Sequence, residues 1–303
     1  MTQDSFSILV TGGTGLIGQA LIPALEASGH RISVLTRRPD RYPSTQNQPG
    51  LFSSLEQIPD SHPVDAVINL AGAPIVGPRW SSRRKQVLRD SRIGLTRNLV
   101  KWMDGRRTPA SVMISGSAVG YYGNRDDDML VESEPPGDDF GALLCRDWES
   151  ETLALKNMGI RGAVIRTGLV LSGSGGMLAP MLPGYKMGLG ARIGNGKQWM
   201  SWIHIEDQVR AICHLLQNPS SSGAYNLTAP VPVHNTEFSD TLARVLNRPR
   251  FLAFPAPMLK LALGEAAVLL LGGQRAIPDK LQQEEFQFRF KKLEDALAQV
   301  AKP

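Results

Sequence analysis

Cysteine is nearly absent from this chain, which has only two among its 303 residues, Cys145 and Cys213. Two cysteines so far apart in sequence provide neither a disulfide framework nor the paired spacing of a zinc site. No cluster of histidine, cysteine, aspartate and glutamate in the sequence suggests another metal. We therefore expect no metal and a reducing, cytoplasmic compartment.

Long apolar runs are also missing, and so is an N-terminal basic segment followed by an apolar one. Strand-like residues begin almost at once, at Phe6. The most apolar later stretch, Met258 to Leu271, is interrupted by Lys260 and Glu265. It is too short and too charged to span a bilayer. We expect a buried helix there and no membrane partner.

The excess of positive charge is small, at +5, and the 42% hydrophobic and 20% charged residues are ordinary for a globular protein. A nucleic-acid-binding surface would gather basic residues on one face beside stacking aromatic residues. The densest basic cluster runs from Arg79 to Arg92 and includes Arg83, Arg84, Lys85 and Arg89. We interpret it as a solvated helix face. A polyanion-binding surface, or one or two arginines that reach a phosphorylated ligand, are the alternatives. We expect a small-molecule partner and no nucleic acid.

The first half of the chain alternates strand-like and helix-like segments. The strand-like runs are apolar and β-branched, at Ile8–Thr11, Ile32–Leu35, Val64–Leu70, Val112–Ser115 and Ala163–Arg166. Helical periodicity fills much of the space between them, at Leu16–Ser28, Ser81–Met103 and Gly141–Met158. Strands separated by helices indicate βαβ units, and near-continuous apolar strands are typical of a sheet covered on both faces. The sequence predicts an α/β fold with a doubly wound parallel sheet.

After Arg166 the pattern changes. Residues 172–201 are glycine-rich and predicted to be loop-like, a helix is expected over 206–217, and a strand over 224–228. Further helices are expected at 235–246, 258–271 and 293–300. We predict a Rossmann domain over residues 1–170, with 204–230 added to it. Residues 171–203 and 231–303 would form a smaller, mainly helical cap, with the substrate between the two parts.

A glycine motif, Thr11 to Gly18, follows the first strand and opens the first helix. Read from Gly13 it satisfies G-x-G-x-x-G, and read from Gly12 it gives G-x-x-G-x-x-G. The first glycine makes the turn, Gly15 lets the backbone approach a pyrophosphate, and Gly18 lets the helix pack on the strand. Free amides at the helix N-terminus then face the phosphates. The residues predicted to bind cofactor here are Gly12, Thr14, Gly15, Leu16 and Ile17.

The end of the second strand distinguishes the two nicotinamide dinucleotides. An NAD site has a carboxylate there that binds the ribose 2′-hydroxyl. This strand instead ends with Thr36, Arg37 and Arg38, and Asp40 comes only after Pro39. Because a guanidinium matches a phosphate geometrically, we predict NADP(H), bound at Thr36 and Arg37. Arginines on a solvated loop are the alternative.

Several segments together resemble the extended short-chain dehydrogenase/reductases, the NAD-dependent epimerase/dehydratase superfamily, and more narrowly its nucleotide-sugar-epimerase-like (YfcH-type) branch. The resemblance covers the whole chain. Its segments are Thr11–Gly18, Asn69–Gly72, Ser91-Arg92, Ile114–Gly123, Arg166–Leu171, Trp202–Asp207 and Gly272–Arg275.

The resemblance implies roles for single residues. The backbone would run past the adenosine and its ribose at Leu70, Ala71 and Gly72. Arg92 would reach toward the cofactor from its helix. Gly168 and Val170 would border the nicotinamide. Ser117 aligns with the serine that hydrogen-bonds the substrate. Dimers are common in the superfamily, so a homodimer is one expectation.

The tyrosine and the lysine four residues later that carry the superfamily's proton chemistry are missing. In the best-aligned stretch Phe140 stands in place of the tyrosine and Leu144 in place of the lysine, and no other tyrosine, Tyr42 included, has a lysine at that spacing. Besides Ser117, the candidates for a chemical role are Tyr121 and Tyr122, on a turn after a strand. The other interpretation of both tyrosines is pocket wall or packing.

Two further reactive residues fit structural roles better. His204 alternates with Ile203 and Ile205, and Cys145 lies on a predicted helix without a basic partner.

Two hypotheses follow. The first is an NADP(H)-dependent oxidoreductase or epimerase acting on a small, nucleotide-sugar-like substrate. The second is a non-catalytic NADP(H)-dependent sensor or interaction protein.

Overall fold

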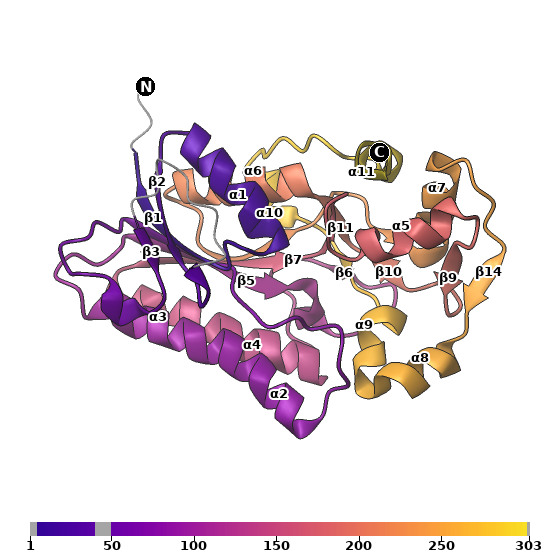
Figure 1. The fold of residues 1–303 in the computed structure, drawn as a ribbon, viewed down its shortest axis with the longest axis horizontal. Coiled ribbons are helices and arrows are strands. Elements are labelled where there is room, and N and C mark those ends of the chain that lie inside the picture. Colours follow the sequence, from indigo (N-terminus) through magenta and orange to yellow (C-terminus); the bar gives the residue numbers. More distant parts are fainter. Residues whose placement is uncertain (1–4, 40–49, 302–303) are drawn as a thin grey trace.

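The fold centres on seven parallel strands, in the order β12-β7-β5-β4-β1-β2-β3 (Figure 1). The computed structural model describes residues 5–39 and 50–301. The strands are β1 (Ser7–Thr11), β2 (Arg31–Leu35), β3 (Gly50–Phe52), β4 (Ala66–Asn69), β5 (Val112–Ala118), β7 (Arg161–Thr167) and β12 (Gly223–Leu227). The order reverses between β1 and β4, and ligands of doubly wound sheets bind at such a switch point. The predicted parallel sheet is confirmed.

Alternate residues of the inner strands supply two apolar cores. In β1, Ile8 and Val10 join one core, whereas Leu9 points into the other. Every residue of β1 and β4 is buried. This burial on both faces explains why these strands read as continuous apolar runs.

Helices cover both faces of the sheet (Figure 1). On one face α1 (Leu16–Ala27) packs on α6 (Ile205–Gln217). On the other, α4 (Phe140–Leu153) packs on α3 (Leu95–Asp104). The predicted helix over 81–103 is interrupted, since α2 (Ser82–Arg89) meets α3 through a π-helical turn, Asp90–Gly94. Such turns occur often at functional sites.

The second half of the chain holds more regular structure than expected. Helix α5 (Leu178–Lys186) and the short strands β9 (Ala191–Ile193) and β10 (Trp199–Met200) lie within 172–201, so the loop prediction for that segment was wrong. The apolar residues of α5 find partners in a core that includes Trp202 and Phe238. Because those partners are distant in sequence, glycine content alone hid the helix.

The remaining short elements belong mostly to this half of the molecule. They are β6 (Met129–Leu130), β8 (Leu169–Leu171), β11 (Trp202–His204), β13 (Val233–His234), β14 (Leu252–Phe254), β15 (Arg275–Ala276), α7 (Asn235–Val245), α8 (Ala256–Leu263), α9 (Val268–Leu271), α10 (Asp279–Gln283) and α11 (Leu293–Ala301).

The stretch from Met258 to Leu271 is not the buried helix that its composition suggested. It is split between α8 and α9, and Gly264 adopts a left-handed φ of +59° where α8 ends. Met258 is 56% exposed and Leu261 is 79% exposed. An apolar pattern predicts a helix face that can be buried, but not that a partner lies against it. In the described residues no helix is long and apolar enough to cross a membrane.

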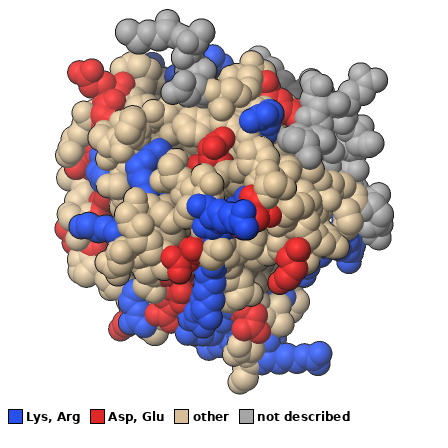
Figure 2. Space-filling view, turned by 90° about the vertical axis from the view of Figure 1, so that its left-hand side faces the viewer, with Lys and Arg blue, Asp and Glu red and all other residues tan. Residues whose placement is uncertain are grey.

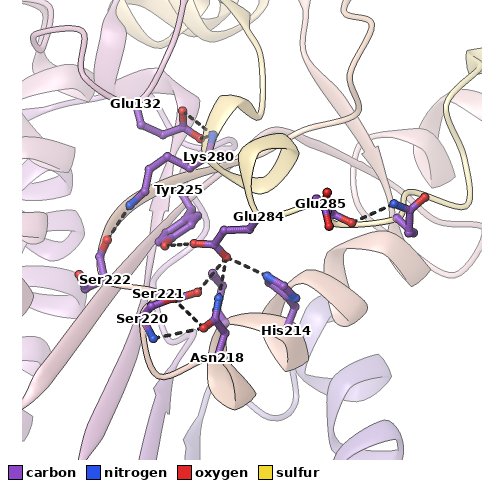
Figure 3. Close-up of polar contacts among 12 residues, drawn as sticks. Glu132, His214, Asn218, Ser220, Ser221, Ser222, Tyr225, Lys280, Glu284 and Glu285 are labelled. Carbon is purple, nitrogen blue, oxygen red and sulfur yellow. Dashed lines mark hydrogen bonds and ion pairs between the residues drawn. The ribbon is translucent and has the colours of Figure 1, made fainter.

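A polar cluster joins the C-terminal segment to the edge of the sheet (Figure 3). The Glu284 carboxylate accepts hydrogen bonds from Tyr225 of β12 at 2.6 Å and from Ser221 at 2.9 Å, and it pairs with His214 of α6 at 2.8 Å. Lys280 of α10 lies over the Tyr225 ring, 3.6 Å from its centroid. The cluster therefore fastens α10 where β12 begins.

Charges of both signs mix on the surface. On the face shown in Figure 2, lysine and arginine side chains alternate with aspartate and glutamate. Within the basic cluster at 79–92, Lys85 pairs with Glu265 at 2.6 Å and Arg89 with Asp147 at 2.8 Å. Two cations of this cluster are thus offset by acidic neighbours.

Candidate active site

The glycine motif forms a tight turn between β1 and α1. Gly12 has a φ of +72°, and a Cβ there would lie 2.6 Å from the Leu70 carbonyl carbon. A Cβ on Gly18 would lie 2.4 Å from the Gly12 oxygen, and the Gly15 N–H donates to that same oxygen at 2.9 Å. Backbone packing thus requires glycine at Gly12 and Gly18. A Cβ on Gly15 would come no closer than 3.2 Å to that oxygen, so a side chain there is restricted less by the fold than by whatever approaches the loop.

A cleft of about 1360 Å³ opens beside this turn. It brings together most of the predicted cofactor residues, which are distant in sequence. The lining includes Gly12, Thr14, Gly15, Thr36, Arg37, Arg38, Leu70, Ala71 and Gly72. Asp40 and Tyr42 lie outside the described residues. The described rim at the end of β2 therefore presents two guanidinium groups to the cleft.

A second hollow of about 230 Å³ adjoins the first at Gly12, Gly15 and Leu70. Leu16, Ile17, Ser117 and Val170 line it, together with Trp148. Gly168 lies nearby but serves packing, because a Cβ there would lie 2.3 Å from the Ser201 oxygen. The two hollows form one path, from the end of β2 to Ser117.

Ser117 is anchored to a buried ion pair. Its hydroxyl donates to Glu149 Oε1 at 2.6 Å. Arg166 binds the same carboxylate with two hydrogen bonds of 2.9 Å, and the side chains of Arg166 and Glu149 are only 4% and 3% exposed. Because the Ser117 hydroxyl donates its hydrogen bond to a carboxylate, its oxygen is left to accept a hydrogen bond from a group in the hollow.

Sequence reasoning missed Glu149 and Arg166. A signal existed, because Arg166 follows the apolar run Ala163–Ile165 in a strand predicted to be buried. Buried charges require partners. The partner itself, on α4, could not be identified without the fold.

The two tyrosine candidates lie differently from Ser117. Tyr122 is fully buried, donates to Asn226 Oδ1 at 2.7 Å and accepts from Arg166 at 2.9 Å. Burial raises the Tyr122 pKa to about 12. Tyr121 is half-buried, and its ring centroid lies 3.5 Å from the Arg166 guanidinium carbon. Burial also raises the pKa of Tyr121. These placements count against a catalytic role for Tyr122 and favour support of Arg166 by both rings.

The positions that carry the superfamily's tyrosine and lysine are apolar in three dimensions too. The Phe140 ring meets Trp80 edge-on, with centroids 5.0 Å apart. Leu144 is 1% exposed, within a cluster that contains Leu88 and Trp148. Neither Phe140 nor Leu144 can exchange a proton, so the usual phenol chemistry has no counterpart there, even though Lys85 Nζ lies 4.8 Å from the Phe140 ring centroid.

His204 and Cys145 lie within the structure as packing and capping residues. The His204 Nδ1 accepts from the Glu206 N–H at 3.2 Å at the start of α6, and Nε2 contacts Gln299 at 2.7 Å. Burial lowers the pKa of His204, which keeps it neutral. Burial raises the Cys145 pKa to about 11, so its thiol is unreactive near neutral pH.

Arg92 lies behind the loop that follows β4. A Cβ on Gly72 would lie 3.1 Å from its guanidinium carbon, and that carbon is 5.4 Å from the Trp148 ring centroid. The π-helical turn places it there. Arg92 is thus between the large cleft, which Gly72 lines, and the second hollow, which Trp148 lines.

Sheet order, glycine turn and cleft together define a Rossmann-type protein of the short-chain dehydrogenase/reductase class. Residues 8–228 match the NAD dependent epimerase/dehydratase family, and residues 254–300 match a domain of unknown function, DUF1731. The chain therefore belongs to the NAD-dependent epimerase/dehydratase family, which confirms the resemblance seen in its sequence.

Relatives similar over nearly the whole chain include an epimerase family protein of Mycobacterium bovis, 42% identical, with 96% of each chain covered. The chloroplastic SDR39U1 homolog of Arabidopsis thaliana is 39% identical, with 98% of this chain and 87% of the relative covered.

Two solved structures are also similar. One is human epimerase family protein SDR39U1 (isoform 2) with NADPH, at a TM-score of 0.86 and 30% identity, covering 97% of this chain and 99% of that one. The other is a nucleoside-diphosphate sugar epimerase from Corynebacterium glutamicum, at a TM-score of 0.79 and 30% identity, covering 99% of this chain and 59% of that one.

Proposed function

We propose that this chain binds NADP(H) and is an oxidoreductase or epimerase for a small substrate that lies next to Ser117. The observation that carries the proposal is the continuous path from Arg37 and Arg38, past Gly12–Gly15, to Ser117. The volume of the large cleft and its glycine turn suit an extended dinucleotide whose phosphates meet the α1 N-terminus. The opposite end leaves a hollow beside one polarised hydroxyl.

The preference for NADP(H) rests on the end of β2. Arg37 and Arg38 line the cleft where an NAD site has its acid, and both are exposed to receive a phosphate. The NADPH in the human relative supports the same choice.

The other cofactor contacts follow from the lining. Gly12, Thr14, Gly15, Leu16 and Ile17 would hold the pyrophosphate side, and Thr36 the adenosine side. Leu70, Ala71 and Gly72 would border the ribose, and Val170, with Gly168 behind it, the nicotinamide. A cofactor role for Arg92 stays a prediction. We also propose the cap of residues 171–203 and 231–303 as the part that encloses the substrate.

NADP(H), when bound, supplies or accepts a hydride. Ser117 would orient a substrate hydroxyl by accepting its hydrogen bond, because its own proton points to Glu149. Passing a proton on to Glu149 would neutralise the partner of buried Arg166, which costs energy. We therefore expect slow turnover compared with enzymes that use a tyrosine and lysine pair.

That cost favours a second candidate, a non-catalytic NADP(H)-dependent sensor or interaction protein. The apolar side chains at Phe140 and Leu144 support it as well. It predicts a protein partner whose affinity changes with NADPH. A partner captured equally with and without NADPH would count against it.

A nucleotide-sugar-like substrate is the finer part of the first candidate. It is supported by the name of the C. glutamicum relative, a nucleoside-diphosphate sugar epimerase. The test is conversion of a panel of such sugars and simpler carbonyl compounds, followed through the absorbance of reduced nicotinamide. No change with any compound would favour the sensor.

The cofactor proposal is tested by titrating NADPH and NADH into the wild type and Arg37→Asp. We expect the variant to lose about 10- to 100-fold in NADPH affinity, because a charge-assisted hydrogen bond is worth about 1.5–3 kcal/mol. Its NADH affinity should rise. Arg107→Gln is the matched control, because Arg107 is 91% exposed and is not among the residues that line the cleft. Equal NADPH affinity in all three proteins would overturn the assignment.

A further inference from the structure

Five cations lie on the helical segment that follows Trp80, and apart from the exposed Arg83 they divide into two kinds. Lys85 and Arg89 each have a carboxylate partner, Glu265 and Asp147. Arg84 and Arg92 have none among the residues that the structure describes. Both reach instead toward the loop that follows β4.

Arg92 keeps its charge in a poorly hydrated place. Its hydrogen-bond contact in the described chain is with its neighbour Ser91, at 3.5 Å. The guanidinium carbon lies 5.4 Å from the centroid of the Trp148 ring, whose indole is fixed by a 2.8 Å hydrogen bond to Thr96. Burial lowers the pKa of Arg92. An unpaired, desolvated cation is costly to a fold unless a ligand uses it.

Arg84 adds a second cation with unused hydrogen-bonding capacity. Its Nη2 donates to the Pro74 carbonyl oxygen, two residues beyond the glycine that Arg92 touches. Its Nε is buried and has no partner in the described part of the chain. The positive charge of Arg84 also lowers the pKa of Arg92, so the two guanidinium groups repel each other. An anion held between them would relieve that repulsion and accept the free N–H groups.

We propose that Arg84 and Arg92 together bind an oxyanion of the substrate, a carboxylate or a phosphate, beside the Ser117 hollow. Trp148 connects the two places, because it lines that hollow and also lies under Arg92. The hollow of about 230 Å³ is small, so the acidic group would lie close to the reacting carbon. The inference rests on the proposed function only in taking this hollow as the place of reaction.

The test is calorimetric titration of inorganic phosphate, and separately of acetate, into protein saturated with NADP+. Saturation occupies the cofactor's own phosphate sites. We expect the wild type to bind at least one of the two anions, and Arg84→Gln and Arg92→Gln to weaken that binding by about tenfold each. Arg83→Gln is the matched control, because Arg83 is exposed on the same helix. The anion that binds more tightly indicates whether the substrate carries a phosphate or a carboxylate.

Either of two binding results would overturn the proposal. One is anion binding that is absent from the wild type or equal in all four proteins. The other is an Arg92→Gln variant that loses NADP+ affinity and keeps its anion affinity, since the cation would then serve the cofactor. A wild type that does not bind NADP+ would instead refute the proposed function. The anion titration would then be repeated on cofactor-free protein. Comparison with Arg37→Asp would show how much of the anion binding occurs at the end of β2.

A stability measurement separates ligand binding from a structural role. If Arg92 serves a ligand, Arg92→Met should melt at the same temperature as the wild type or higher, since it removes an unpaired cation. A clearly lower melting temperature without added anion would show that the fold depends on Arg92, and the proposal would fail.

Discussion

At the glycine end of the cleft the ligand-facing surface is mostly backbone, whereas at the Ser117 end it is side chains fixed by a buried ion pair. Gly12, Gly15 and Gly18 shape the first end through a single turn. The second end needs Ser117 from β5, Glu149 from α4 and Arg166 from β7. The first is local in sequence, and the second exists only in the folded chain.

It follows that cofactor binding and chemistry are separable in this scaffold. The glycine turn depends on sterics, so it can persist when the residues at the other end change. Phe140 and Leu144 have replaced ionisable groups with apolar packing, and the remaining polar groups near Ser117 are engaged with one another. The following changes test whether the two ends are independent.

The largest effect should come from removing the charge of Glu149. Glu149→Gln leaves Arg166 as an uncompensated buried cation, which should cost about 3–5 kcal/mol of unfolding free energy. The measurement is urea denaturation. Glu151→Gln on the same helix is the control, because Glu151 pairs with the half-exposed Arg97 and should lose less than about 1 kcal/mol. Equal losses would mean that the substrate end is not held by its ion pair.

Gly15→Ala should act on the other end with a smaller effect. The new methyl group would lie 3.2 Å from the Gly12 oxygen, so the fold needs only a slight adjustment. It would stand where a pyrophosphate approaches, and overpacking of about 1–3 kcal/mol corresponds to about a 5- to 150-fold loss of NADPH affinity. Calorimetry gives the affinity and thermal unfolding the stability. Unchanged NADPH affinity would show that the pyrophosphate does not bind at this turn.

The same contrast explains what the sequence could predict. The sheet, the glycine turn and the pair Arg37-Arg38 follow from runs and motifs within a few residues. Glu149 lies 32 residues from Ser117 and 17 from Arg166, and no local pattern joins them. Helix α5 and the exposed α8 were misjudged for the same reason, since burial depends on partners distant in sequence. The π-helical turn at Arg92 likewise has no signal in periodicity.

The loss of stability at alkaline pH should show how strongly the tyrosine at the substrate end is buried. Burial raises the pKa of Tyr122 and of Tyr225 to about 12 in the folded protein, whereas an unfolded tyrosine titrates near about 10. The folded state keeps both protons, so this stability is complete below about pH 10 and is lost as the pH rises to about 12. Each tyrosine should contribute about 3 kcal/mol of that loss. Denaturation at several pH values measures it.

Tyr122→Phe isolates the part that belongs to the substrate end, because Tyr225 lies in the Glu284 cluster at the sheet edge. The variant should show a shallower loss of stability with rising pH than the wild type. Parallel curves would mean that Tyr122 titrates normally and exchanges protons with the cleft, which would restore it as a catalytic candidate.

The smallest effect on stability should come from Phe140→Tyr. The ring is half-buried against Trp80, so a hydroxyl should change the unfolding free energy by no more than about 0.5 kcal/mol. We also expect no gain in NADPH-dependent reduction, because Leu144 stands where the superfamily has its lysine, and the nearby Lys85, 4.8 Å from the Phe140 ring centroid, is paired with Glu265. Leu144→Lys is the contrasting variant, since Leu144 is buried and an ammonium there should destabilise the fold strongly. A gain of activity in Phe140→Tyr alone would break the comparison. Lys85, whose Nζ lies 4.8 Å from the Phe140 ring centroid, would then be the cation that completes the pair.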